Sequence, residues 1–515
     1  MSNSFYITTP IYYPNAEPHL GHAYCTVMTD VLARFHRLMG EETFFLTGTD
    51  EHGVKMVKTA AAANVEPGAL ADKNAAIFRQ LWKDWRISND DFIRTTEPRH
   101  MLAVQEIVRR LVANGDIYLG GYEGWYDEGQ EEFVTETEAK INNYKSAVNA
   151  KPLVRYKEHS YFFRLTKYAP KVLEYIEKNP GFIQPDSRRN EVLSKLRAGV
   201  DDLSISRATL KWGIQMPNDP GHVVYVWIDA LSNYITALGF GSADEAGYKK
   251  FWPGVHIIGK EILWFHSVYW PAMLMSLGEP LPKQIFAHGW WTSGGMKMSK
   301  SLNNAIDLEK LNGIAQTYSL DALRYYLVRA ASFGADLDWT DADFHKAFNE
   351  LANVLGNCLN RTIKMIGKYR NGAIPQIGAL EEIDRNLIAR ADGLAQAIKD
   401  ASGRFELQQC AMLPIELARL TNGYIDSTEP FKLAKDPAKA ERLSTVLALA
   451  AQSMYKALVA LIPVLPEKAV EGLKQLNVDV TGKSFDQLMA TPLPEGHSLG
   501  EGTPLFPRVE TVQPG

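Results

Sequence analysis

The sequence predicts an α/β fold with a parallel sheet, which an insertion divides and an α-helical bundle follows. Two observations carry this prediction: a strand–helix–strand pattern opens the chain, and the pattern after Asp338 is almost purely helical. The 515 residues are enough for roughly three domains. A content of 46% apolar and 22% charged residues is typical of a globular protein.

The chain opens with a βαβ unit. Residues 5–9 and 43–47 are short runs of β-forming residues. Between them apolar residues recur at helical spacing, and Gly40 is placed to end the helix. The apolar positions are Leu20, Tyr24, Val27, Val31, Phe35 and Leu38. Because a crossover helix joins parallel strands, we expect a parallel sheet.

Three later runs, residues 223–228, 255–258 and 285–288, are predicted to be further strands of this sheet. Residues 116–221, with many acidic residues and hairpin-like turns, are predicted to be an insertion that splits it. After the sheet an apolar stripe marks a long amphipathic helix, at Phe344, Phe348, Leu351, Leu355 and Leu359. Residues 446–465 are the most apolar stretch, but Gln452, Lys456 and Pro463 favour a buried helix over a membrane span.

These patterns give an expected order of parts. The sheet domain has a first half at 1–115 and a second half at 222–292, with the insertion at 116–221 between them. A loop and linking domain at 293–343, a helical bundle at 344–475 and a C-terminal segment at 476–515 follow.

Charge and cysteine content exclude several classes. The net charge of −5 argues against a protein that coats nucleic acid nonspecifically, although a local site remains possible. The three cysteines, with no CxxC, give neither a disulfide framework nor a structural zinc site. The N-terminus lacks the basic and apolar regions of a secretory signal, so a cytoplasmic location is expected. GxGxxG, GxxxxGK[ST] and HExxH are absent.

The first chemical motif is His19-Leu20-Gly21-His22, at the expected start of the first helix. A helix N-terminus offers free N–H groups and a partial positive charge, which suit a triphosphate. Residues three apart lie on one side of the first turn, and Gly21 lets a flat ring approach the backbone. Alone, the motif is equally compatible with an ordinary helix start.

The second motif is Lys297-Met298-Ser299-Lys300-Ser301, which follows Gly294-Gly295. Two lysines on a glycine-hinged loop can close over phosphates and neutralise charge in a transition state. Alone, this motif is also compatible with a solvated loop.

The two motifs together, one after the first strand and one after the last, resemble those of class I aminoacyl-tRNA synthetases. Four further segments are similar to the methionyl-tRNA synthetases of that class: ITTPIYYPN at 7–15, TGTDEHG at 47–53, YVWIDAL at 225–231 and IGKE at 258–261. The resemblance runs from about residue 4 to residue 435. It implies a Rossmann-type catalytic domain with a connective insertion, and an anticodon-binding helical bundle.

The resemblance also implies an enzyme of protein biosynthesis, a methionine–tRNA ligase. Such an enzyme joins L-methionine to ATP with release of pyrophosphate, and transfers the methionyl group to the 3′ end of tRNA(Met), including initiator tRNA. The implied catalytic residues are His19, His22, Lys297 and Lys300. The implied ATP-binding residues are His19, Gly21, His22, Gly259, Lys260, Glu261 and Lys300, with Mg²⁺ accompanying the triphosphate. Positioning and electrostatics do the work, without a covalent nucleophile.

For methionine the resemblance implies a pocket in which Asp50 anchors the α-ammonium group. The implied residues are Ile11, Tyr13, Asp50, Trp227, Ala230, Leu231, Tyr234, Ile262, His266 and Trp270. A thioether is polarizable and packs well against aromatic rings, so this set suits the substrate.

For the anticodon the resemblance implies Asn357, Arg361 and Phe431. Asn357 and Arg361 are four apart, away from the apolar stripe, and are expected to be exposed and adjacent. Phe431 stands where the family commonly has tryptophan, and keeps a face on which a base can stack.

Two departures from the family matter. Asp127 stands where many members have the first cysteine of a zinc knuckle, so we expect no metal site and no structural zinc. The chain also ends without room for the tRNA-binding and dimerising domain of longer members, so a monomer is expected.

Other functions fit less well. Synthetases for isoleucine, valine and leucine carry a large editing insertion, for which residues 116–221 are too few. A cysteinyl synthetase needs metal-binding cysteines, and Cys25 is the only cysteine in the catalytic half. A non-catalytic RNA-binding relative would lose the ATP motifs, and a stand-alone nucleotidyltransferase would leave the helical region without a role.

Overall fold

The computed structural model describes residues 4–130, 132–134, 136–298, 306–330, 334–507 and 509. The chain divides into two compact units, each of which contains two separate stretches of sequence. The first unit is Met1–Pro18 with Thr43–Trp290, and the second is His19–Glu42 with Trp291–Gly515.

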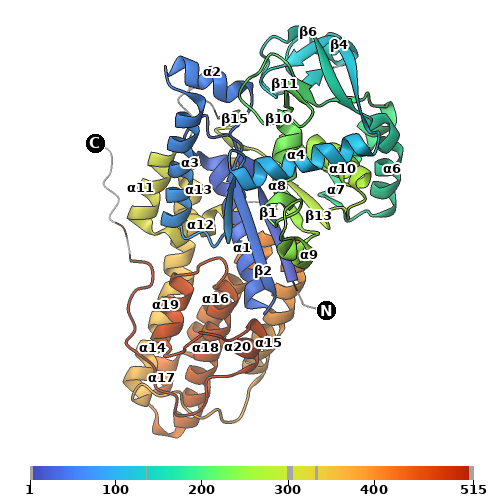
Figure 1. Cartoon of the computed structure of the whole chain (residues 1–515). Coiled ribbons are helices and arrows are strands. Elements are labelled where there is room, and N and C mark those ends of the chain that lie inside the picture. The colour runs from blue at the N-terminus through green and yellow to red at the C-terminus, as the bar shows by residue number, and fades with distance from the viewer. Residues whose placement is uncertain are drawn as a thin grey trace, which may run out of the picture. The chain divides into compact units, whose positions relative to one another are not determined.

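The first unit is built on a six-stranded sheet with the order β3-β2-β1-β12-β13-β7 (Figure 1). The strands are β1 (Ser4–Tyr12), β2 (Glu42–Thr49), β3 (Asp91–Arg94), β7 (Ile183–Gln184), β12 (Val255–Gly259) and β13 (Gln284–His288). The pairs β2–β3, β1–β12, β12–β13 and β13–β7 are parallel. Neighbouring strands β1 and β2 are connected in the chain by α1 (Leu20–Leu38), which confirms the predicted βαβ unit.

One predicted strand is wrong in part. Residues 223–228 are half strand and half helix, because β11 (Asp219–Val224) ends just before α8 (Val226–Thr236) begins. β11 pairs with β9 (Ser206–Arg207) and β10 (Gln215–Met216) in a separate antiparallel sheet. Every residue of α8 is buried, so tertiary packing overrides the β propensity of this apolar run.

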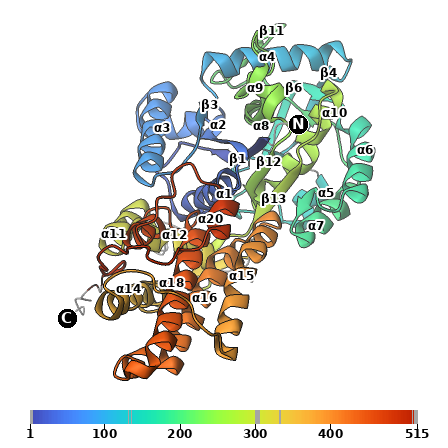
Figure 2. The same ribbon diagram turned by 90° about the horizontal axis from the view of Figure 1, so that it is seen from below.

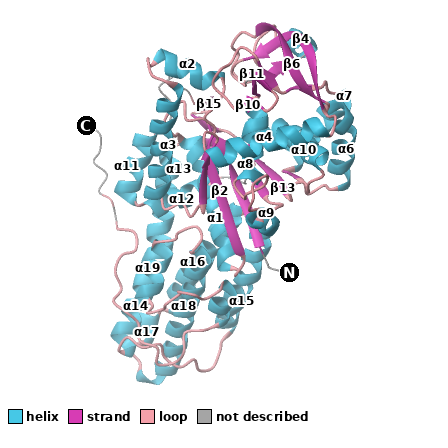
Figure 3. Cartoon of the chain, in the orientation of Figure 1, coloured by secondary structure: helices cyan, strands magenta, loops and turns pink. Residues whose placement is uncertain are grey.

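The remaining strands of the first unit form a four-stranded sheet with the order β5-β4-β6-β8 (Figure 3). Its strands are β4 (Ile117–Asp127), β5 (Glu132–Val134), β6 (Val154–Phe163) and β8 (Leu203–Ser204), and its pairs are antiparallel. The helices of this unit are α2 (Val54–Ala62), α3 (Pro67–Asp84), α4 (Pro98–Ala113), α5 (Glu136–Ile141), α6 (Leu165–Lys178), α7 (Asp186–Ala198), α8, α9 (Ala246–Phe251) and α10 (Trp270–Leu277). A 3₁₀ turn (Lys260–Ile262) and a π turn (Phe265–Tyr269) precede α10.

The second unit is mainly helical (Figure 2). It contains α1, a small sheet of β14 (Trp291–Ser293), β15 (Met296–Lys297) and β16 (Leu337–Trp339), and α11 (Leu308–Tyr318), α12 (Leu320–Arg329) and α13 (Asp341–Glu350). The helices that follow are α14 (Asn357–Arg370), α15 (Glu382–Gly403), α16 (Leu407–Thr428), α17 (Pro430–Leu433), α18 (Ala440–Leu461), α19 (Lys468–Gln475) and α20 (Phe485–Ala490). α18 packs against α14, α15, α16 and α19.

The apolar stripes of this unit point into its core as predicted. All five stripe residues from Phe344 to Leu359 are buried, although a π-helical turn at Leu351–Gly356 joins α13 to α14 within the predicted single helix. Pro437–Leu461 has the length and composition of a membrane span, but 83% of its apolar window is buried inside the structure. The prediction of a buried helix in this region is confirmed.

Candidate active site

The carboxyl ends of strands β1, β2 and β12 carry several of the predicted site residues of the first unit. Ile11 and Tyr13 lie at the end of β1, Asp50 follows β2, and Gly259 ends β12. The backbone N–H of Asp50 donates to the carbonyl of Tyr12 at 2.8 Å, which ties the ends of β1 and β2 together. In open parallel sheets ligands bind at this edge.

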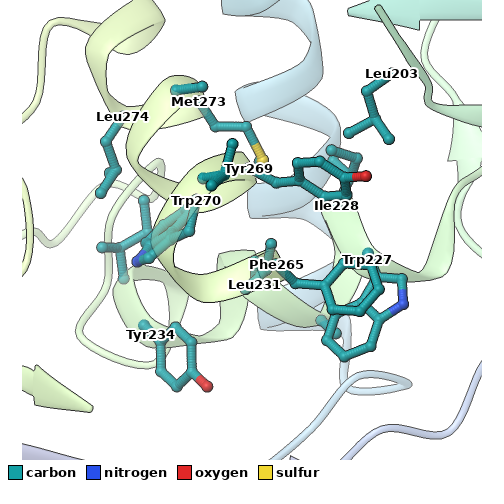
Figure 4. Packing of buried hydrophobic residues seen from close by; sticks show 14 of the residues in the cluster. Leu203, Trp227, Ile228, Leu231, Tyr234, Phe265, Tyr269, Trp270, Met273 and Leu274 are labelled. Carbon is teal, nitrogen blue, oxygen red and sulfur yellow. The ribbon is translucent and has the colours of Figure 1, made fainter. Parts of the chain in front are cut away.

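Aromatic side chains predicted to contact methionine lie on α8 and α10 and pack in one buried cluster (Figure 4). The rings of Trp227 and Phe265 are stacked with centroids 3.7 Å apart and planes 6° from parallel. The ring of Tyr234 lies 6.1 Å from that of Trp270, which is fully buried. Ala230 and Leu231 belong to the same apolar cluster, and the partly buried Ile11, Tyr13 and Ile262 pack against it.

Tyr234 and His266 are joined by a hydrogen bond whose direction the structure fixes. His266 Nδ1 lies 2.9 Å from the carbonyl oxygen of Ile262, which can only accept, so Nδ1 carries the proton. Burial lowers the pKa of His266 to about 4, so the ring is neutral near pH 7. Its Nε2 therefore accepts from the Tyr234 hydroxyl at 2.7 Å.

Lys260 and Glu261 flank the ring of Trp290. The Lys260 ammonium lies 4.1 Å from the ring centroid, and the indole N–H donates to Glu261 at 2.8 Å. Gly259 is buried, and a Cβ there would come within 2.4 Å of Glu261 Oε1, so a larger residue would displace the Glu261 side chain.

In the second unit, His19 and His22 cap the N-terminus of α1, as the motif predicts. His19 Nδ1 accepts the N–H of Gly21 at 3.1 Å, and His22 Nδ1 accepts the N–H of His19 at 3.2 Å. The rings are stacked with centroids 3.9 Å apart. Because both Nδ1 atoms accept, the ring proton of each neutral histidine sits on Nε2.

Electrostatics favour the neutral form at His22. Burial, and then the neighbouring His19, lower the pKa of His22 well below its usual value. The uncharged His22 ring therefore has an Nε2–H group that can donate a hydrogen bond to a phosphate oxygen.

The KMSKS segment is only partly described. Lys297 lies in β15, which pairs with β14 through Thr292. Lys300 lies outside the described residues. Asp307 bridges to His19 by strand-like pairing, so the chain that leaves this segment returns to the N-terminus of α1.

The predicted anticodon residues lie on α14 and α17 of the second unit. Asn357 is exposed, and Phe431 is 43% exposed. Arg361 is only partly exposed, and it forms an ion pair with Asp426 of α16 at 2.8 Å.

A buried cluster of one carboxylate and two histidines was not predicted from the sequence. Asp229 of α8 accepts from His52 and from His100 of α4, at 2.6 and 2.7 Å. Asp229 and His52 stand inside the segments YVWIDAL and TGTDEHG, which was the available signal, whereas nothing in the sequence marks His100. The partner of Trp227, Phe265, was likewise not singled out.

Among the residues that the structure describes, no three His, Cys, Asp or Glu side chains gather to hold a metal ion. At the position expected for a zinc knuckle, Asp127 accepts the N–H groups of Gly129 and Gln130 at 2.8 and 3.2 Å. Nearby, Ser146 Oγ accepts those of Val148 and Asn149 at 3.2 and 3.3 Å.

The parallel sheet, the histidine-capped helix after its first strand and the lysine loop after its last strand are the combination expected of a class I aminoacyl-tRNA synthetase. The comparisons agree. The family described as tRNA synthetases class I (M) matches residues 5–363. The methionine–tRNA ligase of Bacillus subtilis is 46% identical over 99% of this chain and 79% of its own length. That of Enterococcus faecalis is 46% identical over 98% of this chain and 77% of its own length.

A solved structure extends the similarity to the fold. Mycobacterium tuberculosis methionyl-tRNA synthetase in complex with methionyl-adenylate superposes with a TM-score of 0.94 at 40% identity, covering 98% of this chain and 100% of that one. The chain therefore belongs to the class I aminoacyl-tRNA synthetases and, within them, to the methionine–tRNA ligases. Its α/β core with a helical C-terminal region is the fold of that family.

Proposed function

We propose that this chain activates L-methionine with ATP to form methionyl-adenylate and pyrophosphate. It then transfers the methionyl group to the 3′ end of tRNA(Met), including initiator tRNA. Family membership supports the reaction. The observation that carries the choice of substrate is the buried cluster that contains Trp227, Tyr234 and Trp270, against which Ile11 and Tyr13 at the end of β1 pack.

In this proposal methionine is held at both ends. The buried Asp50 carboxylate accepts a charge-assisted hydrogen bond from the α-ammonium group of methionine. The thioether packs against the aromatic rings, where a polarizable sulfur is favoured. The neutral Tyr234–His266 pair fixes one wall of this pocket without placing a charge next to the sulfur.

The phosphates of ATP are assigned to the other motifs. The Nε2–H groups of His19 and His22 and the free N–H groups of the α1 N-terminus stabilise charge at the α-phosphate, and Lys297 and Lys300 hold the departing pyrophosphate. Gly259, Lys260 and Glu261 contact the adenosine. Mg²⁺ belongs to the ATP substrate and neutralises part of its charge.

For tRNA, the helical bundle is proposed to bind the anticodon through Asn357, Arg361 and Phe431. Arg361 exchanges its exposed partner Asp426 for a base edge, and Phe431 offers a face for stacking. The proposal also includes the expected domain boundaries, a monomer, a cytoplasmic location and no structural zinc.

The test is methionine-dependent exchange of labelled pyrophosphate into ATP without tRNA, beside a Lys300→Ala control. Exchange that requires methionine and is lost in the control supports the proposal. Exchange that requires another amino acid would support an aminoacyl-tRNA synthetase but refute methionine as its substrate. No exchange from folded protein would refute the catalytic assignment.

A further inference from the structure

A buried carboxylate behind the proposed methionine pocket is held between two histidines from distant parts of the chain. Asp229 is fully buried on α8. Its Oδ2 lies 2.6 Å from His52 Nδ1, and its Oδ1 lies 2.7 Å from His100 Nε2. His52 follows β2, and His100 is a buried residue of α4, so this bridge joins three elements.

In this cluster Asp229 is an ionised carboxylate, and His52 and His100 each donate a hydrogen bond to it. Burial alone would raise the pKa of Asp229, but the facing His52 and His100 hold it below its usual value. At the other side of its ring, His100 Nδ1 forms a hydrogen bond with the Thr236 hydroxyl at 2.7 Å. Both carboxylate oxygens thus have short, charge-assisted bonds, which are stronger and more directional than neutral ones.

The position of His52 gives the bridge a functional meaning. It lies two residues after Asp50, the proposed anchor of the ammonium group, and directly before Gly53, whose φ of 100° lies in the region that favours glycine. Asp229 lies between Trp227 and Ala230 on α8, the helix that forms the pocket wall. A hydrogen bond between His52 and Asp229 therefore fixes the ammonium anchor relative to the wall that receives the side chain.

We propose that the His52–Asp229–His100 bridge is a positioning device that sets the distance between the two halves of the methionine pocket. This inference rests on the proposed function. None of the three residues is placed in contact with substrate. They act through Asp50 on one side and through Trp227 and its neighbours on the other.

The test measures KM for methionine and KM for ATP separately in pyrophosphate exchange. His52→Ala removes the donor, and we expect KM for methionine to rise about tenfold or more, while KM for ATP changes less than about twofold. His52→Asn places an amide N–H where Nδ1 lies, and is expected to restore KM to near the wild-type value. His52→Gln places its amide further out, near Nε2, and is expected to fail.

The control variant is Tyr168→Phe, which removes another buried hydrogen bond to a carboxylate, Tyr168–Asp116 at 2.6 Å, in the same unit. It is expected to lower thermal stability without changing KM for methionine. If His52→Ala does not fold, the comparison of His52→Asn with His52→Gln decides the matter. The positioning role would be overturned if these two variants had the same KM for methionine. It would also be overturned if KM for methionine and KM for ATP rose in parallel. Absence of methionine-dependent exchange in the wild-type protein would instead refute the proposed function.

Discussion

Asp127 and Ser146 show how single side chains close two adjacent turns in the insertion. Each accepts two backbone N–H groups, and Asn149 Oδ1 accepts a further one from Lys151 at 2.9 Å. The turns touch, because a Cβ on Gly129 would lie only 2.0 Å from Asn149 Nδ2. Side-chain oxygens thus satisfy the backbone N–H groups that these turns leave without a main-chain acceptor.

The first prediction concerns this pair of turns. Asp127→Ala leaves two N–H groups without their acceptor and is expected to cost about 1–3 kcal/mol of stability. Asp127→Asn keeps an acceptor oxygen and is the matched control, expected to melt near the wild type. Thermal unfolding measures both, and the wild-type melting temperature is expected to be the same with and without a chelator. A chelator-induced drop would show that a metal supports this region.

At this scale the sequence was informative where chemistry is local. His19 and His22 are three residues apart, so their position on one helical turn follows from spacing alone. His100 and Asp229 are separated by 129 positions, and no local pattern connects them. Lone buried histidines have no sequence signature, because burial and partner are both set by tertiary packing.

At the scale of elements, Asp384 joins three helices of the bundle. It is fully buried on α15 and accepts from Tyr424 of α16 at 2.6 Å and from both terminal nitrogens of Arg442 of α18, at 2.5 and 3.0 Å. It also accepts the N–H of Glu381 at 2.8 Å and so caps its own helix. Burial alone would raise the pKa of Asp384, but Arg442 and Tyr424 hold it below its usual value.

The second prediction is that Asp384→Asn destabilises the protein by about 3 kcal/mol near neutral pH, because it leaves Arg442 without its buried counter-charge. The pKa of Asp384 is lower in the folded state than in the unfolded chain, where it is about 3.9. The ionised carboxylate therefore stabilises the folded protein at higher pH, and this stabilisation is lost as the pH falls through the folded-state pKa. The difference in the free energy of unfolding between wild type and Asp384→Asn is therefore expected to become smaller below about pH 4. Urea unfolding from pH 3 to pH 7 measures it.

The control for this prediction is Glu381→Gln. Glu381 reaches the same arginine at 3.1 Å, but its side chain is 62% exposed. An exposed pair contributes about 0–1 kcal/mol, so this variant is expected to be close to wild type at every pH. Equal effects of the two variants would contradict the assignment of stability to the buried carboxylate.

The third prediction concerns α17. Phe431→Ala removes the exposed ring and is expected to raise KM for tRNA about tenfold or more, because stacking of a base is worth about 1–3 kcal/mol. Phe431→Trp keeps the stacking face and is expected to bind tRNA at least as well as the wild type. Aminoacylation kinetics measure both, and pyrophosphate exchange without tRNA should be unchanged. A similar KM for the alanine and tryptophan variants would exclude stacking at this position.

Elements with a strong period were predictable and short ones were not. α1 and the stripe from Phe344 to Leu359 repeat at helical spacing, and the structure buries both. β7 has only two residues, too few for any period, yet it joins the edge of the main sheet. The strand predicted at residues 223–228 was wrong in part for a related reason. A short buried apolar run has the same sequence pattern in a strand and in a helix.

At the scale of the whole molecule, the net charge is −5, so a polyanion such as tRNA needs a local basic face. α14 offers one in the second unit. Asn357, Arg361, Lys364 and Lys368 follow one another at steps of four, three and four and so share one helical face. Asn357, Lys364 and Lys368 are exposed. This arrangement places two lysines beside the two residues proposed to contact the anticodon.

The last prediction follows from counterion release. The logarithm of the tRNA binding constant is expected to fall linearly with the logarithm of salt concentration. Lys364→Ala combined with Lys368→Ala is expected to reduce the slope by about 1–2, because each lysine that neutralises a phosphate contributes roughly one unit. Filter binding or anisotropy from 50 to 300 mM KCl, about the range in which such contacts are resolved, measures the slope.

Charge alone must be separated from position in this experiment. Lys249→Ala combined with Lys474→Ala removes the same charge from exposed lysines of α9 and α19. This control is expected to keep the wild-type slope, and both double variants should retain methionine-dependent pyrophosphate exchange. If the two double variants lower the slope equally, the face of α14 has no special part in tRNA binding. A change confined to the α14 variant makes it the local basic surface through which an acidic protein binds an acidic partner.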